Sequence, residues 1–181
     1  MMEIPSVPVR IRHRLLLVGP HGAQQERVAL LLLGRSRELV HSASVRPAST
    51  GMRSATVVPQ GWGEQRLEVT EAPPLEWLGG RCNTDLHAYE MVLAMLNEYA
   101  ATTTVVFCVH GNDTTHGVRP NRFINQLQEN IGQHVRGIIV VTGTSLAVDT
   151  LFDVVCGPGA RPVVMQALDK SPGVILQVAG L

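Results

Sequence analysis

The sequence lacks an excess of charge of either sign, paired cysteines and long hydrophobic runs. It has 15 basic and 15 acidic residues, so it carries no electrostatic footprint for nucleic acid or an anionic membrane. The three cysteines, Cys82, Cys108 and Cys156, are an odd number without paired spacing, which favours a reducing compartment. No run reaches the roughly 18 apolar residues of a membrane span. We therefore expect a cytoplasmic protein that does not bind nucleic acid and has no transmembrane segment.

The chain does have the composition of a globular protein. It has 181 residues, of which 45% are hydrophobic and 17% charged, enough for one well-buried domain. Short apolar runs without helical period alternate with segments of helix formers, which indicates a parallel sheet covered by helices on both faces. The expected strands are 15–18, 55–59, 65–70, 102–109, 137–142 and 161–166. The expected helices are 24–33, 86–99, 121–131, 147–155 and one starting near 173.

Residues 15–35 have the shape of a phosphate-binding loop, an apolar strand followed by a glycine turn and a helix. A working loop reads GxxxxGK(S/T); its lysine reaches the outer phosphates and its hydroxyl holds magnesium. Here Gly19 opens the pattern, but Gln24, Gln25 and Glu26 replace the glycine, lysine and hydroxyl residue. The Cβ of Gln24 hinders close approach of the loop backbone to the phosphates. Gln25 lacks the positive charge of the lysine, and the Glu26 carboxylate repels the phosphates. We expect nucleotide binding to be lost.

The segment RLLLVGPHGAQQERVALLLLGR, Arg14 to Arg35, resembles without a gap the start of a GIMAP domain, from the GTPases of immunity-associated proteins. The shared LVG, the second glycine, Gly22, and the closing LGR carry this resemblance. The family's DTPG box is replaced here by four residues, of which only the first proline is kept: Glu71, Ala72, Pro73 and Pro74. Pro74 has no N–H to donate to a terminal phosphate.

The resemblance continues to about residue 167. The stretch TTTVVFCVHGNDTTHGVRPNRFINQLQENIGQHVRGIIVVTGT (102–144) is similar to the family's strand, loop, helix and strand, and VVCGPGARPVVMQA (154–167) to its closing segment. The acidic base-reading residue is missing after Thr142, and Asp149 lies too late to be assumed as its substitute. The phosphate loop, the DTPG box and the base-reading segment are thus all degraded.

The resemblance implies an α/β fold, a three-layer P-loop GTPase-like domain with a mainly parallel central sheet flanked by helices. We expect residues 1–11 to be a flexible leader and 12–181 a single GTPase-like domain. The implied function is a non-catalytic pseudo-GTPase without a cofactor, acting as an interaction or self-assembly module. Its partner would be itself or a related GTPase, bound through the switch-like loops 36–55 and 71–81.

Four residues are candidates for the interaction surface. Trp62, in a Gly-Trp-Gly turn, is either an exposed contact anchor or folded back over the sheet edge. The other three are Arg46, Arg53 and Trp77. Glu26 is a candidate to compensate an arginine in the empty pocket, so exchanging it for Gln should destabilise the fold.

Two other functions stay open from the sequence. The first is a weak GTPase in which His21 or Arg27 does the work of the lysine. The second is an unrelated small-molecule enzyme on the same scaffold, since a fold does not fix a function.

Cys108 and His110 share a strand face. With the loop residues Asp113 and His116 they could form a nucleophile pair, or with His87 or His134 a zinc site. No metal-ligand spacing supports the zinc site, and a buried cysteine with a loop histidine is the commoner arrangement.

Overall fold

A computed structural model describes residues 10–19, 25, 28–29, 52–59, 61–74, 83–110, 120–142 and 164–166. These residues contain one six-stranded sheet in the order β2-β3-β1-β4-β5-β6. The strands are β1 (Ile11–Val18), β2 (Arg53–Val57), β3 (Arg66–Glu71), β4 (Thr103–His110), β5 (Arg136–Thr142) and β6 (Val164–Gln166). The helical elements are α2 (Asn83–Tyr99), the 3-10 turn η2 (Ala100–Thr102) and α3 (Pro120–Ile131).

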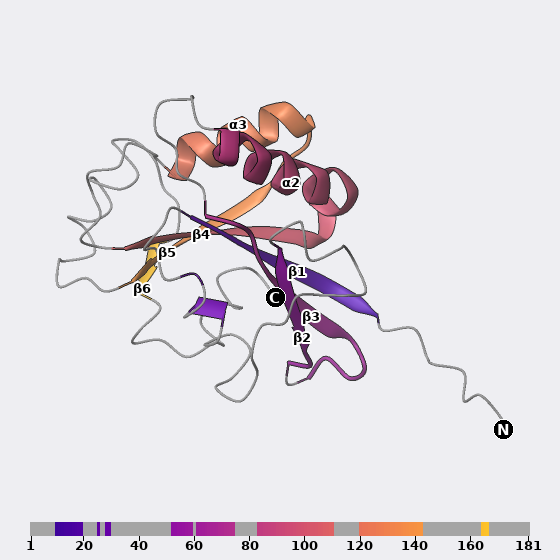
Figure 1. The fold of residues 1–181 in the computed structure, drawn as a ribbon. Coiled ribbons are helices and arrows are strands. Elements are labelled where there is room, and N and C mark those ends of the chain that lie inside the picture. Colours follow the sequence, from indigo (N-terminus) through magenta and orange to yellow (C-terminus); the bar gives the residue numbers. More distant parts are fainter. Residues whose placement is uncertain are drawn as a thin grey trace, which may run out of the picture.

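The sheet is parallel except at one edge. β1 pairs with β3 and β4 in parallel, β4 with β5, and β5 with β6, whereas β2 and β3 form an antiparallel hairpin. β1 lies at the centre because its last four residues, Leu15 to Val18, are fully buried on both sides of the sheet. The expected mainly parallel, three-layer α/β fold is confirmed, and Figure 1 shows α2 and α3 together on one face.

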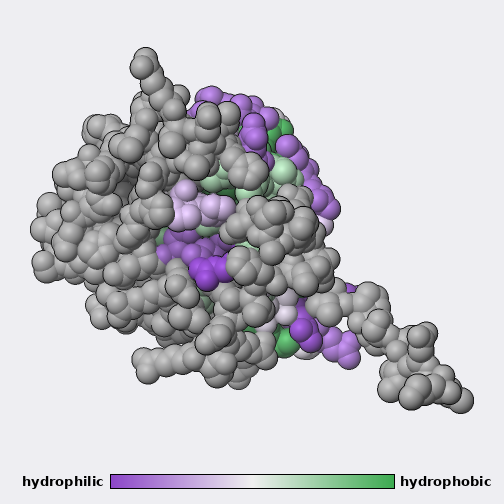
Figure 2. All heavy atoms as spheres, in the orientation of Figure 1, coloured by the Kyte–Doolittle hydropathy of each residue, from purple (hydrophilic) through white to green (hydrophobic). Residues whose placement is uncertain are grey.

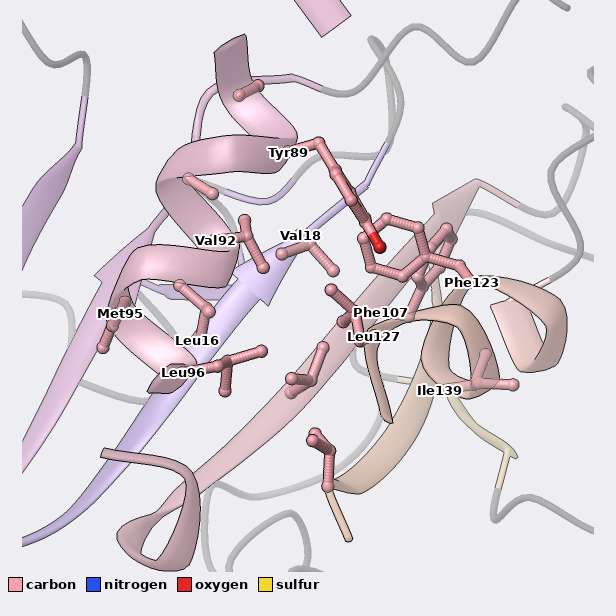
Figure 3. Packing of buried hydrophobic residues seen from close by; sticks show 14 residues of the cluster. Leu16, Val18, Tyr89, Val92, Met95, Leu96, Phe107, Phe123, Leu127 and Ile139 are labelled. Atoms are coloured by element: carbon pink, nitrogen blue, oxygen red, sulfur yellow. The ribbon is translucent and has the colours of Figure 1, made fainter. Parts of the chain in front are cut away.

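Alternating side chains of the sheet build two cores. On one face Leu16, Val18 and Phe107 pack with α2 and α3 (Figure 3). Phe107 meets Phe123 of α3 edge to face, with ring centroids 5.3 Å apart, a geometry that aromatic pairs prefer. On the other face the core contains Leu15, Leu17, Cys108 and two residues that follow the first glycine turn, Val28 and Ala29. Helical residues therefore cover both faces, as the alternating pattern predicts.

Several predicted element boundaries were wrong, among them the start of α2, which begins at Asn83 rather than at residue 86. β1 begins at Ile11 rather than at residue 15, so the ordered sheet reaches into the predicted leader 1–11. The first half of β1 was not predicted as strand because it contains the polar residues His13 and Arg14, although both pair in register with β3. β2 begins at Arg53, inside the predicted loop 36–55, because Arg53 lies opposite Glu71 in the hairpin.

α3 shows how the local sequence sets its ends. Pro120 opens the helix, where its missing N–H has no intrahelical partner to lose. Gly132 closes it with φ of 71°, a left-handed conformation that favours glycine, and its N–H donates to the Gln128 carbonyl at 2.8 Å. None of the helices in the described part of the chain has the length and hydrophobicity needed to span a bilayer.

Candidate functional site

The carboxyl ends of the parallel strands form the edge at which open α/β sheets bind ligands. β1 ends at Val18 and is followed by the buried Gly19. β3 ends at Glu71, which lies opposite Leu17 of β1. The pairing continues one residue further, since the Ala72 N–H donates to the Leu17 carbonyl at 2.9 Å. The structure therefore brings the start of the phosphate-loop segment and the start of the DTPG-box segment side by side.

Gln25 occupies the position of the phosphate-loop lysine and turns back onto that loop. Its side-chain Nε2 donates to the Gly19 carbonyl at 2.8 Å, and the residue is only 6% exposed. The carbonyl of Gly19 can only accept, so the amide nitrogen must face it and the oxygen must point elsewhere. Among the described residues, Gln25 Oε1 is buried without a hydrogen-bond partner. The lysine position thus holds a neutral amide that is hydrogen-bonded to the loop's own backbone.

Glu71, in the first position of the DTPG box, is held by an arginine of the neighbouring strand. Arg53 Nη2 lies 2.6 Å from Glu71 Oε2, and the two side chains are 29% and 13% exposed. A charge-assisted hydrogen bond of this length is among the strong ones in proteins. Arg53 was predicted to lie on an interaction surface and Glu71 to be a vestigial nucleotide-site residue. Their contact is not predicted by the sequence.

Cys108 lies in the core beneath this edge. The thiol is fully buried, and its Sγ lies 3.8 Å from the Val106 carbonyl oxygen. Burial, and after it the negative charge of Glu71, raises the pKa of the Cys108 thiol. A thiol that resists ionisation is a poor nucleophile, so the structure argues against the cysteine nucleophile considered from the sequence.

The metal hypothesis has no support in the described residues. Among them, no three His, Cys, Asp or Glu side chains gather as a possible ligand set. His134, one of the proposed zinc ligands, is exposed beyond the end of α3, at the opposite edge from His110.

The other predicted site residues are spread over the molecule. Pro74, the last residue of the DTPG box, is exposed. Trp62 lies in the β2–β3 hairpin, half-buried against the core that contains Leu67 and Val69. The remaining ones lie outside the described residues: Gly22, Gln24, Glu26, Arg46 and Trp77, together with the proposed substitutes His21 and Arg27.

One buried titratable residue was not noticed in the sequence. His13 of β1 is 9% exposed, and its Nε2 lies 2.8 Å from Thr104 Oγ1 of β4. Burial, and after it the positive charges of Arg136, Arg14 and Arg12, lower the pKa of His13 to about 4. The only sequence signal was a polar residue two positions before a run of buried leucines, where the strand period places it on the face of Leu15 and Leu17.

Comparison with known proteins places the fold but not the family. No family model matches the sequence, and a search of curated proteins finds no match. The G domain of the Thermotoga maritima FeoB iron transporter is similar in structure, with a TM-score of 0.55 and 13% identity over 92% of this chain and 95% of that one. The FeoB G domain of Methanococcus jannaschii gives 0.51 and 12% over 93% and 98%.

A third similar structure is a variant of Aquifex aeolicus Era bound to GDP and AlF4, with a TM-score of 0.53 and 14% identity. There the match covers 92% of this chain and 56% of that one. At such identities the likeness concerns the fold alone. The chain therefore has the fold of a P-loop GTPase G domain.

Proposed function

We propose that the protein is a pseudo-GTPase, a G-domain fold that has lost nucleotide binding and serves as an interaction module. The side chain of Gln25 is the observation that carries the proposal. Its amide hydrogen-bonds the loop's own carbonyl at Gly19, and its unpaired oxygen is a buried acceptor. A neutral amide bonded to the loop's own backbone supplies no positive charge to a phosphate, which the lysine of a working loop does.

The Arg53–Glu71 pair supports the same proposal. A carboxylate at this edge could otherwise contribute to a magnesium site, since Mg²⁺ prefers carboxylate and water oxygens. Here a guanidinium lies 2.6 Å from that carboxylate, within a hairpin of the sheet. The pair gives Glu71 a counter-charge that belongs to the protein and thereby weakens the attraction of this carboxylate for a metal ion.

We further propose that this pseudo-GTPase is of the GIMAP type. It rests on the ungapped similarity of residues 14–35 and on the order of the later segments. In this proposal the loops 36–55 and 71–81 at the nucleotide-side edge, with Arg46 and Trp77, meet a second copy or a related GTPase. Sedimentation velocity of the purified chain over a hundredfold concentration range tests self-association, and a monomer throughout would leave the related GTPase as the partner.

Calorimetric titration with GDP and GTP in the presence of Mg²⁺, using protein stripped of ligand by unfolding and refolding, tests the loss of nucleotide binding. We expect no saturable heat up to high micromolar nucleotide. Saturable, magnesium-dependent binding would refute the proposal and favour the weak GTPase with a non-standard phosphate loop.

Restoring the motif provides the matched control. Gln25→Lys returns the positive charge, and the triple variant Gln24→Gly, Gln25→Lys, Glu26→Ser returns the whole GKS sequence. If the replaced residues are the cause of the loss, the triple variant should gain measurable nucleotide affinity and the single variant less. Gln25→Met, similar in length but without the amide, should gain none, because it removes the hydrogen bond to the Gly19 carbonyl without supplying a positive charge.

A further inference from the structure

The two interaction loops proposed above join the sheet at one place. Loop 36–55 runs into β2, whose first residue is Arg53, and loop 71–81 begins at Glu71, the last residue of β3. Arg53 and Glu71 lie directly opposite each other in the hairpin. We call residues 52–54 and 70–72 the two loop roots. Whatever fixes the roots to the sheet therefore fixes the points from which both loops start.

On the face of the sheet that carries α2 and α3, apolar contacts anchor both roots. Ala72 is 2% exposed and belongs to the core that contains Leu16, and Met52 packs against the same core. The Ala72 N–H also donates to the Leu17 carbonyl at 2.9 Å, which joins the second root to β1. All these contacts lie within the chain, so they do not require a ligand.

On the other face a charge pair joins the two roots. Arg53 shares this face with Ala55 and Val57, which pack against the second core. The Glu71 carboxylate lies close to that core, since its negative charge, after the larger effect of burial, raises the pKa of the buried Cys108 thiol. A carboxylate that is only 13% exposed needs a counter-charge, and Arg53 Nη2 supplies it at 2.6 Å.

The charge pair is the contact on which both roots depend most. Figure 2 shows hydrophilic surface in the middle of the molecule, near where Figure 1 draws the ends of the central strands, so water competes for polar groups at this edge. Removing one partner of a largely buried ion pair costs more than removing both, because it leaves an uncompensated charge. Loss of Arg53 alone should therefore release both roots together, since Glu71 would have to turn toward water.

We propose that the Arg53–Glu71 pair is a clamp that holds both loop roots on the sheet in the ligand-free protein. A carboxylate at the ligand-binding edge of an open α/β sheet can be neutralised by a bound cation, and here the guanidinium of the chain itself neutralises it. The clamp fixes the start of both loops before any partner is bound. What the loops bind rests on the proposed function, whereas the closure of the roots does not.

The test is amide hydrogen exchange, followed by NMR on the 15N-labelled full chain without nucleotide. Ala72 reports the second root, and the protected amides among residues 53–55 report the first. Val106 in the central strand β4 reports global unfolding, so root exchange is compared with it in every variant. The variants are Arg53→Gln, Glu71→Gln and the double variant. Arg14→Gln is the matched control, because it breaks another arginine–glutamate pair of β3, in which Arg14 Nε lies 3.3 Å from Glu68 Oε1.

We expect a protected Ala72 amide in the ligand-free natural chain. Arg53→Gln should speed exchange at both roots about ten-fold relative to Val106, as for an opening free energy lowered by about 1.4 kcal/mol. Glu71→Gln and the double variant should speed it less, because neither leaves a carboxylate without its counter-charge. Arg14→Gln should change root exchange by less than about two-fold relative to Val106.

Three outcomes would overturn the clamp. The first is rapid exchange of Ala72 in the natural chain. The second is faster exchange at the first root alone in Arg53→Gln, which would make the pair a contact of the hairpin only. The third is a double variant that opens as far as Arg53→Gln. These readouts need neither nucleotide nor partner, so a failed clamp and a failed pseudo-GTPase proposal are told apart by the exchange and the calorimetric titration.

Discussion

The Arg53–Glu71 pair should stabilise the β2–β3 hairpin by an amount that a double-mutant cycle can measure. A hydrogen bond to a charged group contributes roughly 1.5–3 kcal/mol when it is buried, whereas an exposed ion pair contributes about 0.2–1 kcal/mol. The pair lies between these cases, with side chains 29% and 13% exposed and an N–O distance of 2.6 Å. We therefore expect a coupling free energy of about 1–2 kcal/mol.

The assay is urea unfolding of four proteins: the natural chain, Arg53→Gln, Glu71→Gln and the double variant. Both residues also have other interactions, so the single variants overstate the pair and only the coupling isolates it. The cycle at Arg14 and Glu68, joined at 3.3 Å, is the comparison and should give a smaller coupling. A coupling free energy near zero at Arg53–Glu71 would refute the reasoning, because the two side chains would then not stabilise each other.

Three further predictions concern stability. Gly132→Ala should cost about 1 kcal/mol because φ is 71° and only the backbone opposes the change, while Gly132→Asn should cost less; urea midpoints of both variants check this. Leu127→Ala, in the fully buried core under α3, should cost about 2–5 kcal/mol in unfolding free energy, and a loss below 1 kcal/mol would contradict the packing. The His13 ring, whose pKa is lowered to about 4 from 6.5, binds its proton more weakly when folded, so stability should be complete above about pH 6.5 and fall as the pH drops toward 4, by at most about 2–3 kcal/mol. His13→Gln should flatten this pH dependence of the urea midpoint, and the exposed His134→Gln should leave it unchanged.

Much of the fold could be predicted because buried segments are recognisable as apolar runs in the sequence. The strand around Val105 and the helix ending at Ile131 were predicted within one residue of their ends. Boundaries failed where polar residues take part in the sheet, as at His13 and Arg53. The strand order could not be predicted either, because pairing between β1 and its neighbours depends on contacts between residues far apart in sequence.

The site was predictable in its positions but not in its contacts. Gly19, Gln25 and Glu71 could be placed by the spacing of a known motif. That Gln25 turns toward the Gly19 carbonyl depends on a rotamer, and that Arg53 meets Glu71 depends on the register of a hairpin. A one-residue slip in that register would put the two side chains on opposite faces of the sheet. The motif specifies neither the rotamer of Gln25 nor the register of the hairpin, so neither contact could be predicted.

The central position of β1 has a consequence for synthesis of the chain. His13 of β1 and its partner Thr104 of β4 are 91 residues apart in sequence. At a translation rate of about 5–20 residues per second, the ribosome needs roughly 5–18 s to make that interval. During this time the strand with four fully buried residues, Leu15 to Val18, has no β4 to pair with. Such an unpaired apolar strand can associate with other chains. The yield of folded protein should therefore depend on how the cell shields this strand while the rest of the sheet is being made.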